Sequence, residues 1–279
     1  MNSFGLLVVI LTCTMINSLF CDYAYAHNFY QNPDSMMITQ GMLFQIENKL
    51  AGNSFPSNVS VSLTHSENAL SLLEDIFLFN IEILDDADFF NKYESLIGDQ
   101  NSTTIALVAA NLADESLKQY GLAIGLDPSQ ASRLLNMSMP MAMGSTMNMV
   151  NNTSEDRYNG SSEMAPMLST DQSLDKILKN SSNDEVINQA NYQTALMLAN
   201  SVKILFGTTL QNATLQNSTG LMRIPIEMKS ESVNSLGQGT DTLLLALNRM
   251  APLEEIFSIV HGQIHPNLFL AFDLKLKVD

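Results

Sequence analysis

The chain has 279 residues, of which 46% are hydrophobic and only 15% are charged, and its 29 Asp and Glu against 13 Lys and Arg give a net charge of −16. A chain of this length buries a core large enough to be stable without disulfides. Its acidity argues against functions that use clustered Lys and Arg to neutralise phosphates, so we expect neither a nucleic-acid partner nor docking to an anionic membrane.

The amino-terminal region predicts export. Residues 4–16 form an apolar run, and a more polar stretch follows that ends at Ala24-Tyr25-Ala26. This pattern is typical of a secretory signal peptide over residues 1–26, cleaved after Ala26. The alternative is an uncleaved anchor, because residues 4–20 form a 17-residue stretch at the lower limit of length for spanning a membrane. We expect a secreted or extracytoplasmic protein that begins at His27 and has no membrane span once the signal is removed.

Two compositional features describe the exported chain. Cys13 and Cys21 both lie within the signal, so the mature protein would have neither disulfides nor thiolate metal ligands. The chain also contains Asn-x-Ser/Thr sequons, which fit an exported glycoprotein, although a chain rich in Asn and Ser produces several by chance. These sequons begin at Asn58, Asn101, Asn136, Asn151, Asn152, Asn159, Asn180, Asn212 and Asn217.

Residues 27–126 form a first helical half. Apolar residues spaced by three, four or seven predict helices over 33–50 and 60–79, a short helix near 85–97, and the clearest helix over 101–124. Pro33 suits the first turn of the first helix, and Ser102 or Thr103 can cap the last one.

A different composition follows over residues 127–170, which are rich in Met, Asn and Ser and predict a solvated linker or loop. Helical periodicity resumes in a second half, residues 171–279, with helices expected over 184–210, 241–250 and 252–264. The expected fold is all-α, with antiparallel helix bundles in two halves joined by the Met-rich loop.

Two short runs compete with this interpretation. Residues 222–228 and 270–278 alternate apolar and polar side chains, and could pair as one minor β-ribbon. Pro225 would confine the first run to an edge strand, because proline cannot donate a hydrogen bond to a neighbouring strand.

Several stretches, AHNFY, LTHSENALSLLEDI, ANLADESLKQYGLAIG and IVHGQIHPNLFLAFDLKL, resemble a group of secreted helical proteins from ammonia-oxidising archaea. The resemblance covers about half of the mature chain and implies secretion and an all-α fold. It carries no activity and no functional residue. The stretches contain all four histidines, whereas the Met-rich segment lies outside them.

The histidines are the first candidate metal ligands. Cleavage after Ala26 would leave His27 with a free α-amino group, which can chelate a metal together with its imidazole, as in histidine-brace copper proteins. His261 and His265 have the i, i+4 spacing that directs two rings to one side of a helix. Pro266 weakens this pair, because the residue before proline is disfavoured in the helical region and His265 would then lie past the helix end. His65 lies on an apolar helix stripe, where a hydrogen-bonded core role competes with a ligand role.

Thioethers are the second candidate, because soft sulfur ligands select Cu(I). The Met-rich segment, residues 127–170, contains methionines two residues apart, with one interruption between residues 143 and 147. Methionine also accumulates in unconstrained linkers, however. The methionines of this pattern are Met137, Met139, Met141, Met143, Met147 and Met149.

The sequence contains no recognisable constellation of catalytic groups, so we do not expect an enzyme. An exported, acidic, glycosylated helical scaffold or interaction protein with a cell-surface or extracellular partner explains the composition best. The alternative is an extracytoplasmic copper-binding protein that uses His and Met ligands.

Overall fold

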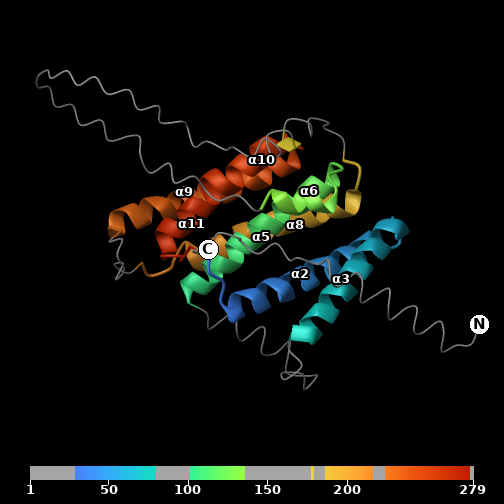
Figure 1. The fold of residues 1–279 in the computed structure, drawn as a ribbon, viewed down its shortest axis with the longest axis horizontal. Helices are drawn as coiled ribbons and strands as arrows, with labels where there is room; N and C mark the ends of the chain where they lie inside the picture. Colours follow the sequence, from blue (N-terminus) through green and yellow to red (C-terminus); the bar gives the residue numbers. More distant parts are fainter. Residues whose placement is uncertain (1–28, 80–100, 136–176, 179–185, 216–223, 277–279) are drawn as a thin grey trace, which may run out of the picture.

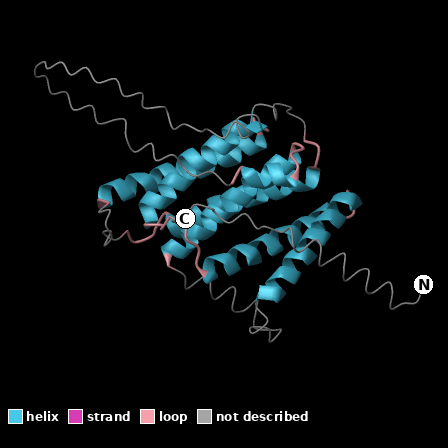
Figure 2. Cartoon of the chain, in the orientation of Figure 1, coloured by secondary structure: helices cyan, strands magenta, loops and turns pink. Residues whose placement is uncertain are grey.

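The computed structural model describes residues 29–79, 101–135, 177–178, 186–215 and 224–276, and these are predominantly helical (Figure 2). The prediction of an all-α fold is confirmed. The longer elements are α2 (Pro33–Ser54), α3 (Val59–Phe79), α5 (Ser102–Ala123), α6 (Pro128–Arg133), α8 (Gln189–Leu205), α9 (Ile226–Asn248), α10 (Leu253–Ile259) and α11 (His265–Phe272), with π-helical turns at Phe206–Leu210 and Val260–Ile264.

Asparagine side chains start four of these helices. A capping oxygen satisfies a backbone N–H that has no partner in the first turn of a helix. Asn101 therefore caps α5, in place of the predicted Ser102 or Thr103, because its Oδ1 accepts from the N–H of Thr104 at 2.8 Å. The same arrangement occurs at Asn32 for α2, Asn58 for α3 and Asn188 for α8.

The two halves of the sequence share one core. In Figure 1, α5 and α8 lie side by side between the α2–α3 hairpin and the group formed by α9, α10 and α11. Buried apolar residues from both sides of the 127–170 segment belong to a single cluster, in which Leu117 of α5 and Leu198 of α8 are fully buried. The halves predicted from the sequence are therefore continuous in space within the described residues, and α5 is the helix that connects their packing.

The predicted β-ribbon is wrong for the residues that the structure describes. Ile226 begins α9 directly after Pro225, whose fixed φ suits the residue that precedes a helix, and residues 270–272 belong to α11. The ladder contact that does occur is an isolated antiparallel bridge between Phe29 and Leu276. This bridge fixes the start of the described chain beside the end of α11.

Candidate functional site

A carboxylate lies deep inside the central helix. Asp114 is in the middle of α5 and is only 1% exposed. Over residues 104–117 α5 is buried on every side, because it passes between the two outer helix groups. A helix buried all round has no solvent-facing side for a charged group. Ala110 and Leu117, which share the face of Asp114, are fully buried, so the carboxylate lies in a hydrophobic core.

Two histidines approach this carboxylate from a π-helical turn. Contrary to the sequence expectation, His265 does not lie past a helix end: its φ of −60° and ψ of −47° are helical. The backbone N–H of His265 donates to the carbonyl of Val260, a π-helical bond that carries the chain from α10 into α11. Pro266 then occupies the first turn of α11, a position at which the fixed φ and missing N–H of proline are tolerated.

The three side chains lie close enough to share one ion. Nε2 of His265 is 3.1 Å from Oδ1 of Asp114, and the ring centroids of His261 and His265 are 5.0 Å apart. One ligand atom from each of the three residues lies within 4.8 Å of the others. Ligand atoms held by one ion at about 2.1 Å lie roughly 3–4.2 Å apart, so small side-chain rotations would bring them into coordination distance.

The protonation of His261 is set by its surroundings. Its Nε2 lies 3.0 Å from the carbonyl oxygen of Leu134, at the carboxyl end of α6, and because a carbonyl only accepts, Nε2 carries the hydrogen. Burial, together with the neighbouring His265, lowers the pKa of His261 to about 4, so the ring is neutral near pH 7. Its Nδ1 then presents a lone pair, as a metal ligand requires.

The cluster holds an unusual number of unsatisfied polar atoms. Both carboxylate oxygens of Asp114, Nδ1 of His261 and both ring nitrogens of His265 are buried without a hydrogen-bond partner among the described residues. The short contact between His265 and Asp114 is out of line for a hydrogen bond. Even an ion pair between these two residues would use one atom of each and leave the other atoms unmatched. Buried polar groups normally have hydrogen-bond partners. A metal ion coordinated by these atoms would take the place of the partners that they lack.

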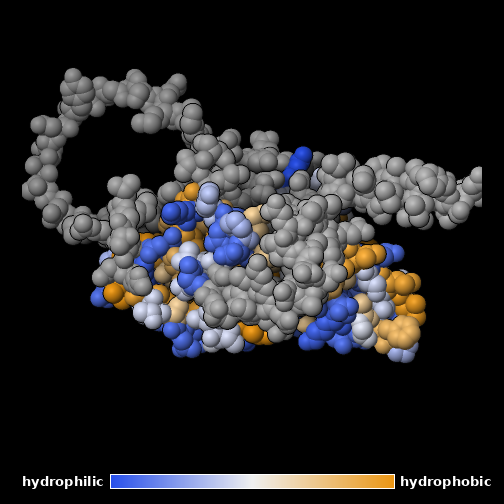
Figure 3. Space-filling model, turned by 90° about the horizontal axis from the view of Figure 1, so that it is seen from below, coloured by the Kyte–Doolittle hydropathy of each residue, from blue (hydrophilic) through white to orange (hydrophobic). Residues whose placement is uncertain are grey.

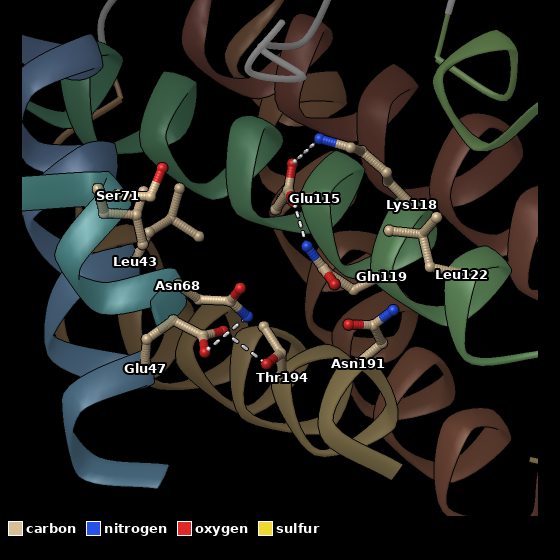
Figure 4. Close-up of a pocket in the computed structure, with 11 residues that line it drawn as sticks. Leu43, Glu47, Asn68, Ser71, Glu115, Lys118, Gln119, Leu122, Asn191 and Thr194 are labelled. Carbon is tan, nitrogen blue, oxygen red and sulfur yellow. Dashed lines mark hydrogen bonds and ion pairs between the residues drawn. The ribbon is translucent and has the colours of Figure 1, made fainter. Parts of the chain in front are cut away.

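A separate pocket lies between the α2–α3 hairpin and the α5–α8 pair (Figure 4). Its volume is about 200 Å³, below the range of roughly 300–1,000 Å³ typical of ligand pockets. Glu47 accepts from Thr194 at 2.6 Å and from Asn68 at 3.2 Å, and Glu115 accepts from two residues of its own helix. Because both carboxylates already accept hydrogen bonds, this pocket offers a ligand fewer unpaired polar atoms than the cluster at Asp114 does.

His65 belongs to this second region and not to the metal cluster. Its Nδ1 lies 2.7 Å from Oε2 of Glu47, and its Nε2 lies 3.1 Å from Oε1 of Gln193. Both partner atoms are oxygens that accept hydrogen bonds, so this arrangement favours the doubly protonated ring, in which both nitrogens donate. Burial opposes this charge, but the hydrogen bond and negative charge of Glu47, with the bond to Gln193, outweigh it and raise the pKa of His65 above its usual 6.5.

We predict that the stabilising contribution of His65 depends on pH. A pKa that is raised in the folded state gives stability that is fully present below about pH 6.5 and lost as pH rises through the folded value. His65→Gln should therefore lower the free energy of unfolding by about 1–3 kcal/mol at pH 5.5 and by less at pH 8.5. Urea unfolding at both pH values measures this, with the exposed Glu67→Gln on the same helix as control. An equal loss at both pH values would contradict it.

The other predicted ligands cannot be placed. His27 and the six methionines from Met137 to Met149 lie outside the described residues. Conversely, Asp114 is missing from the ligands predicted from the sequence. The signal that could have identified it is an acidic residue directly after a helical run, residues 105–113, that contains only Ala, Leu, Val and Ile apart from Asn111, since a helix that is apolar on every face is buried all round.

No described helix combines the length and apolar character needed to cross a membrane. Comparison with known proteins does not add a function: no protein-family model, no curated protein and no solved structure matches this chain. The convergence of Asp114, His261 and His265 is therefore the feature on which a functional assignment has to rest.

Proposed function

We propose that this protein binds a divalent transition-metal ion through Asp114, His261 and His265. The observation that carries the proposal is the convergence of buried ligand atoms without hydrogen-bond partners; among the described residues, the other such side-chain atom is Nε2 of Gln31. An ion held there would neutralise the buried charge of Asp114 and use the lone pair of His261. Helix α5, the π-helical turn at Val260–Ile264 and helix α11 each supply one ligand, from positions fixed by their own packing.

The ligand types narrow the choice of ion. Imidazole nitrogens with one carboxylate oxygen suit copper, zinc, nickel and iron, whereas magnesium and calcium prefer oxygen ligands alone. Among divalent first-row ions, copper binds such a set most tightly. We therefore name Cu(II) as the ion, in an exported protein as the signal-peptide pattern predicts. Cu(I) binding by the Met-rich segment remains a separate prediction from the sequence.

The second candidate is the exported scaffold or interaction protein. It is favoured by a stripe of exposed apolar side chains on α3, where Val59 is 51% and Leu63 and Leu70 are each 58% exposed. Figure 3 shows hydrophobic residues at the right-hand end of the visible face, the end at which α2 and α3 are joined in Figure 1. A contact surface there is compatible with a metal site, and it would be the leading function if no metal bound specifically.

Metal titration of the purified, metal-free protein tests the proposal. We expect one Cu(II) per chain, bound more tightly than by an unfolded peptide of the same composition. Asp114→Asn, His261→Gln and His265→Gln should each weaken binding by about 100-fold or more, because each removes a ligand and leaves the others short of a full set.

Asp241→Asn is the matched control, because Asp241 is an exposed acid on α9. Circular dichroism verifies that each variant is folded. Unchanged affinity in all three ligand variants would refute the metal site and leave the scaffold as the proposed function.

A further inference from the structure

We infer that Gln31 positions the metal-binding carboxylate of Asp114, by donating a hydrogen bond from its side-chain amide to the carboxylate oxygen that does not coordinate the ion. This inference rests on the proposed function and extends it to the residues that surround the ligands. Gln31 lies two residues before the start of α2. Among the described residues, its Nε2 is the buried side-chain atom without a hydrogen-bond partner that lies outside the metal cluster.

The orientation of the Gln31 amide is fixed by the hydrogen bonds to its oxygen. Oε1 accepts from the side-chain amide of Asn111 at 3.1 Å and from the hydroxyl of Ser35, also at 3.1 Å. Asn111 donates in addition to the hydroxyl of Thr39 at 3.2 Å, so a buried chain of hydrogen bonds connects α2, α5 and Gln31. Exchanging the oxygen and nitrogen of Gln31 would place two N–H donors against each other. Nε2, with two hydrogens to donate, is therefore the end of the amide that faces away from Asn111.

The neighbours of Gln31 place it beside the cluster. Asn111, which it contacts, lies three residues before Asp114 on α5, and side chains at this spacing are neighbours on the helix surface, about 5–6 Å apart at their Cβ atoms. Phe29 packs against His265, with ring centroids 5.5 Å apart. The chain is extended there, since Phe29 forms a β-bridge, and side chains two positions apart in an extended chain point to the same side. Gln31 is thus directed toward the side of the molecule that holds the ligands.

Metal binding would leave Asp114 in need of a donor. Both of its carboxylate oxygens are buried without a hydrogen-bond partner among the described residues. If one oxygen coordinates the ion, the lone pairs of the other oxygen still lack a partner. Carboxylates that bind metals are normally hydrogen-bonded by an outer residue, which holds them in the orientation that the ion requires.

The amide of Gln31 has the chemistry to be that outer residue. It is uncharged, so it leaves the charge of Asp114 to the ion, and its N–H groups donate where a carboxylate can only accept. A small side-chain rotation, or one bridging water, would join Nε2 to the free oxygen of Asp114. The bond would satisfy two buried atoms at once, one on each residue.

Cu(II) titration of Gln31→Met tests the inference, because methionine has a similar length and cannot donate a hydrogen bond. We expect the affinity for Cu(II) to fall by about 10–100-fold, as it does when an outer partner of a ligand is lost. The electron paramagnetic resonance spectrum of the bound Cu(II) should also change, because the coordinating carboxylate is no longer held in one orientation. Circular dichroism verifies that the variant is folded, and Gln31→Ala provides the same comparison if Gln31→Met is not.

Thr39→Val is the matched control. It removes the other acceptor of Asn111, and so disturbs the same buried chain of hydrogen bonds without touching Nε2 of Gln31. Both the affinity for Cu(II) and the spectrum should stay as in the wild-type protein. Equal changes in Thr39→Val and Gln31→Met would mean that Gln31 acts only through the packing of α2 on α5, which would overturn the inference.

Asp114→Asn separates this inference from the proposed function. Its amide nitrogen cannot accept from Gln31, so adding Gln31→Met to Asp114→Asn should change the remaining affinity by no more than about 2-fold. If Asp114→Asn weakens Cu(II) binding but Gln31→Met does not, the metal site stands and the role of Gln31 is refuted. If Gln31→Met weakens binding as much in Asp114→Asn as in the wild-type protein, Gln31 does not act through Asp114 and the inference is also refuted. A wild-type protein that binds no Cu(II) specifically would refute both.

Discussion

Asp114→Ala should stabilise the metal-free protein and remove its response to copper. The buried carboxylate of Asp114 has no hydrogen-bond partner among the described residues, and leaving such a group unsatisfied costs about 1–3 kcal/mol. Replacing it with alanine, the best helix former, should raise the free energy of unfolding of the metal-free protein by about that amount.

In saturating copper the wild-type protein should have a higher free energy of unfolding than Asp114→Ala, the reverse of their order without metal. An ion present at about 1,000 times its Kd stabilises the folded state by roughly 4 kcal/mol, and only the wild-type chain would gain this. Urea unfolding followed by circular dichroism, with Cu(II) or with a chelator, measures both effects. Asp241→Ala is the control, since replacing this exposed acid should change stability by no more than about 0.5 kcal/mol in either condition. A loss of stability in metal-free Asp114→Ala would contradict the idea that the carboxylate is held for an ion.

Leu117→Ala and Leu198→Ala should each destabilise the whole protein. Both side chains are fully buried in the shared core, one on α5 and the other on α8. Removing a buried leucine side chain costs about 2–5 kcal/mol, through lost burial and the cavity that remains. In a chain of this size each kcal/mol corresponds to roughly 2–4 °C, so Tm should fall by about 4–20 °C.

Thermal unfolding of these variants should also show a single transition, because α5 and α8 join residues from both halves of the sequence. The exposed Leu245→Ala is the control, since Leu245 on α9 is 66% exposed and its truncation should barely change Tm. Two separate transitions, with only one of them shifted by Leu117→Ala, would show that the halves fold independently.

Local signals were sufficient for most helix positions. The observed helices Pro33–Ser54, Val59–Phe79 and Ser102–Ala123 begin within about a residue of their predicted starts, because proline and polar capping residues mark a helix start in the sequence itself. The short helix expected near 85–97 lies outside the described residues.

The helix α9 begins at Ile226, whereas the sequence predicted a start at residue 241. Gly237 and Gly239 lie inside this helix, and in a sequence glycines resemble helix breakers. A Cβ on Gly237 would lie 2.8 Å from the ring of Phe206, and one on Gly239 would lie 3.4 Å from the side chain of Ile264. These glycines permit close packing between helices, which depends on neighbours that are distant in the chain. The sequence could not supply that information.

The candidate site was also predictable only where it depends on residues that are close in the sequence. The spacing of His261 and His265 predicted a shared side, and their ring centroids do lie 5.0 Å apart. The partner carboxylate comes from a helix almost 150 residues earlier in the chain, and the tautomer of His261 depends on the carbonyl of Leu134. Long-range packing of this kind leaves no local pattern.

The π-helical turn at Val260–Ile264 has a consequence for the register of the helix that contains it. Besides Leu253, Ile259, His265 and Ala271, the residues buried along this helix include a set at every fourth position, 256, 260, 264, 268 and 272. In an α-helix each residue turns the chain by about 100°, so a step of four overshoots a full turn by about 40°, and four such steps would move the stripe by about 160°. The π-helical turn contains more residues per turn than an α-helix, so it offsets part of this rotation and keeps His265 directed toward α5. Removing one residue from the turn would rotate everything after it, so the ligand set depends on the number of residues in this turn as well as on their identity.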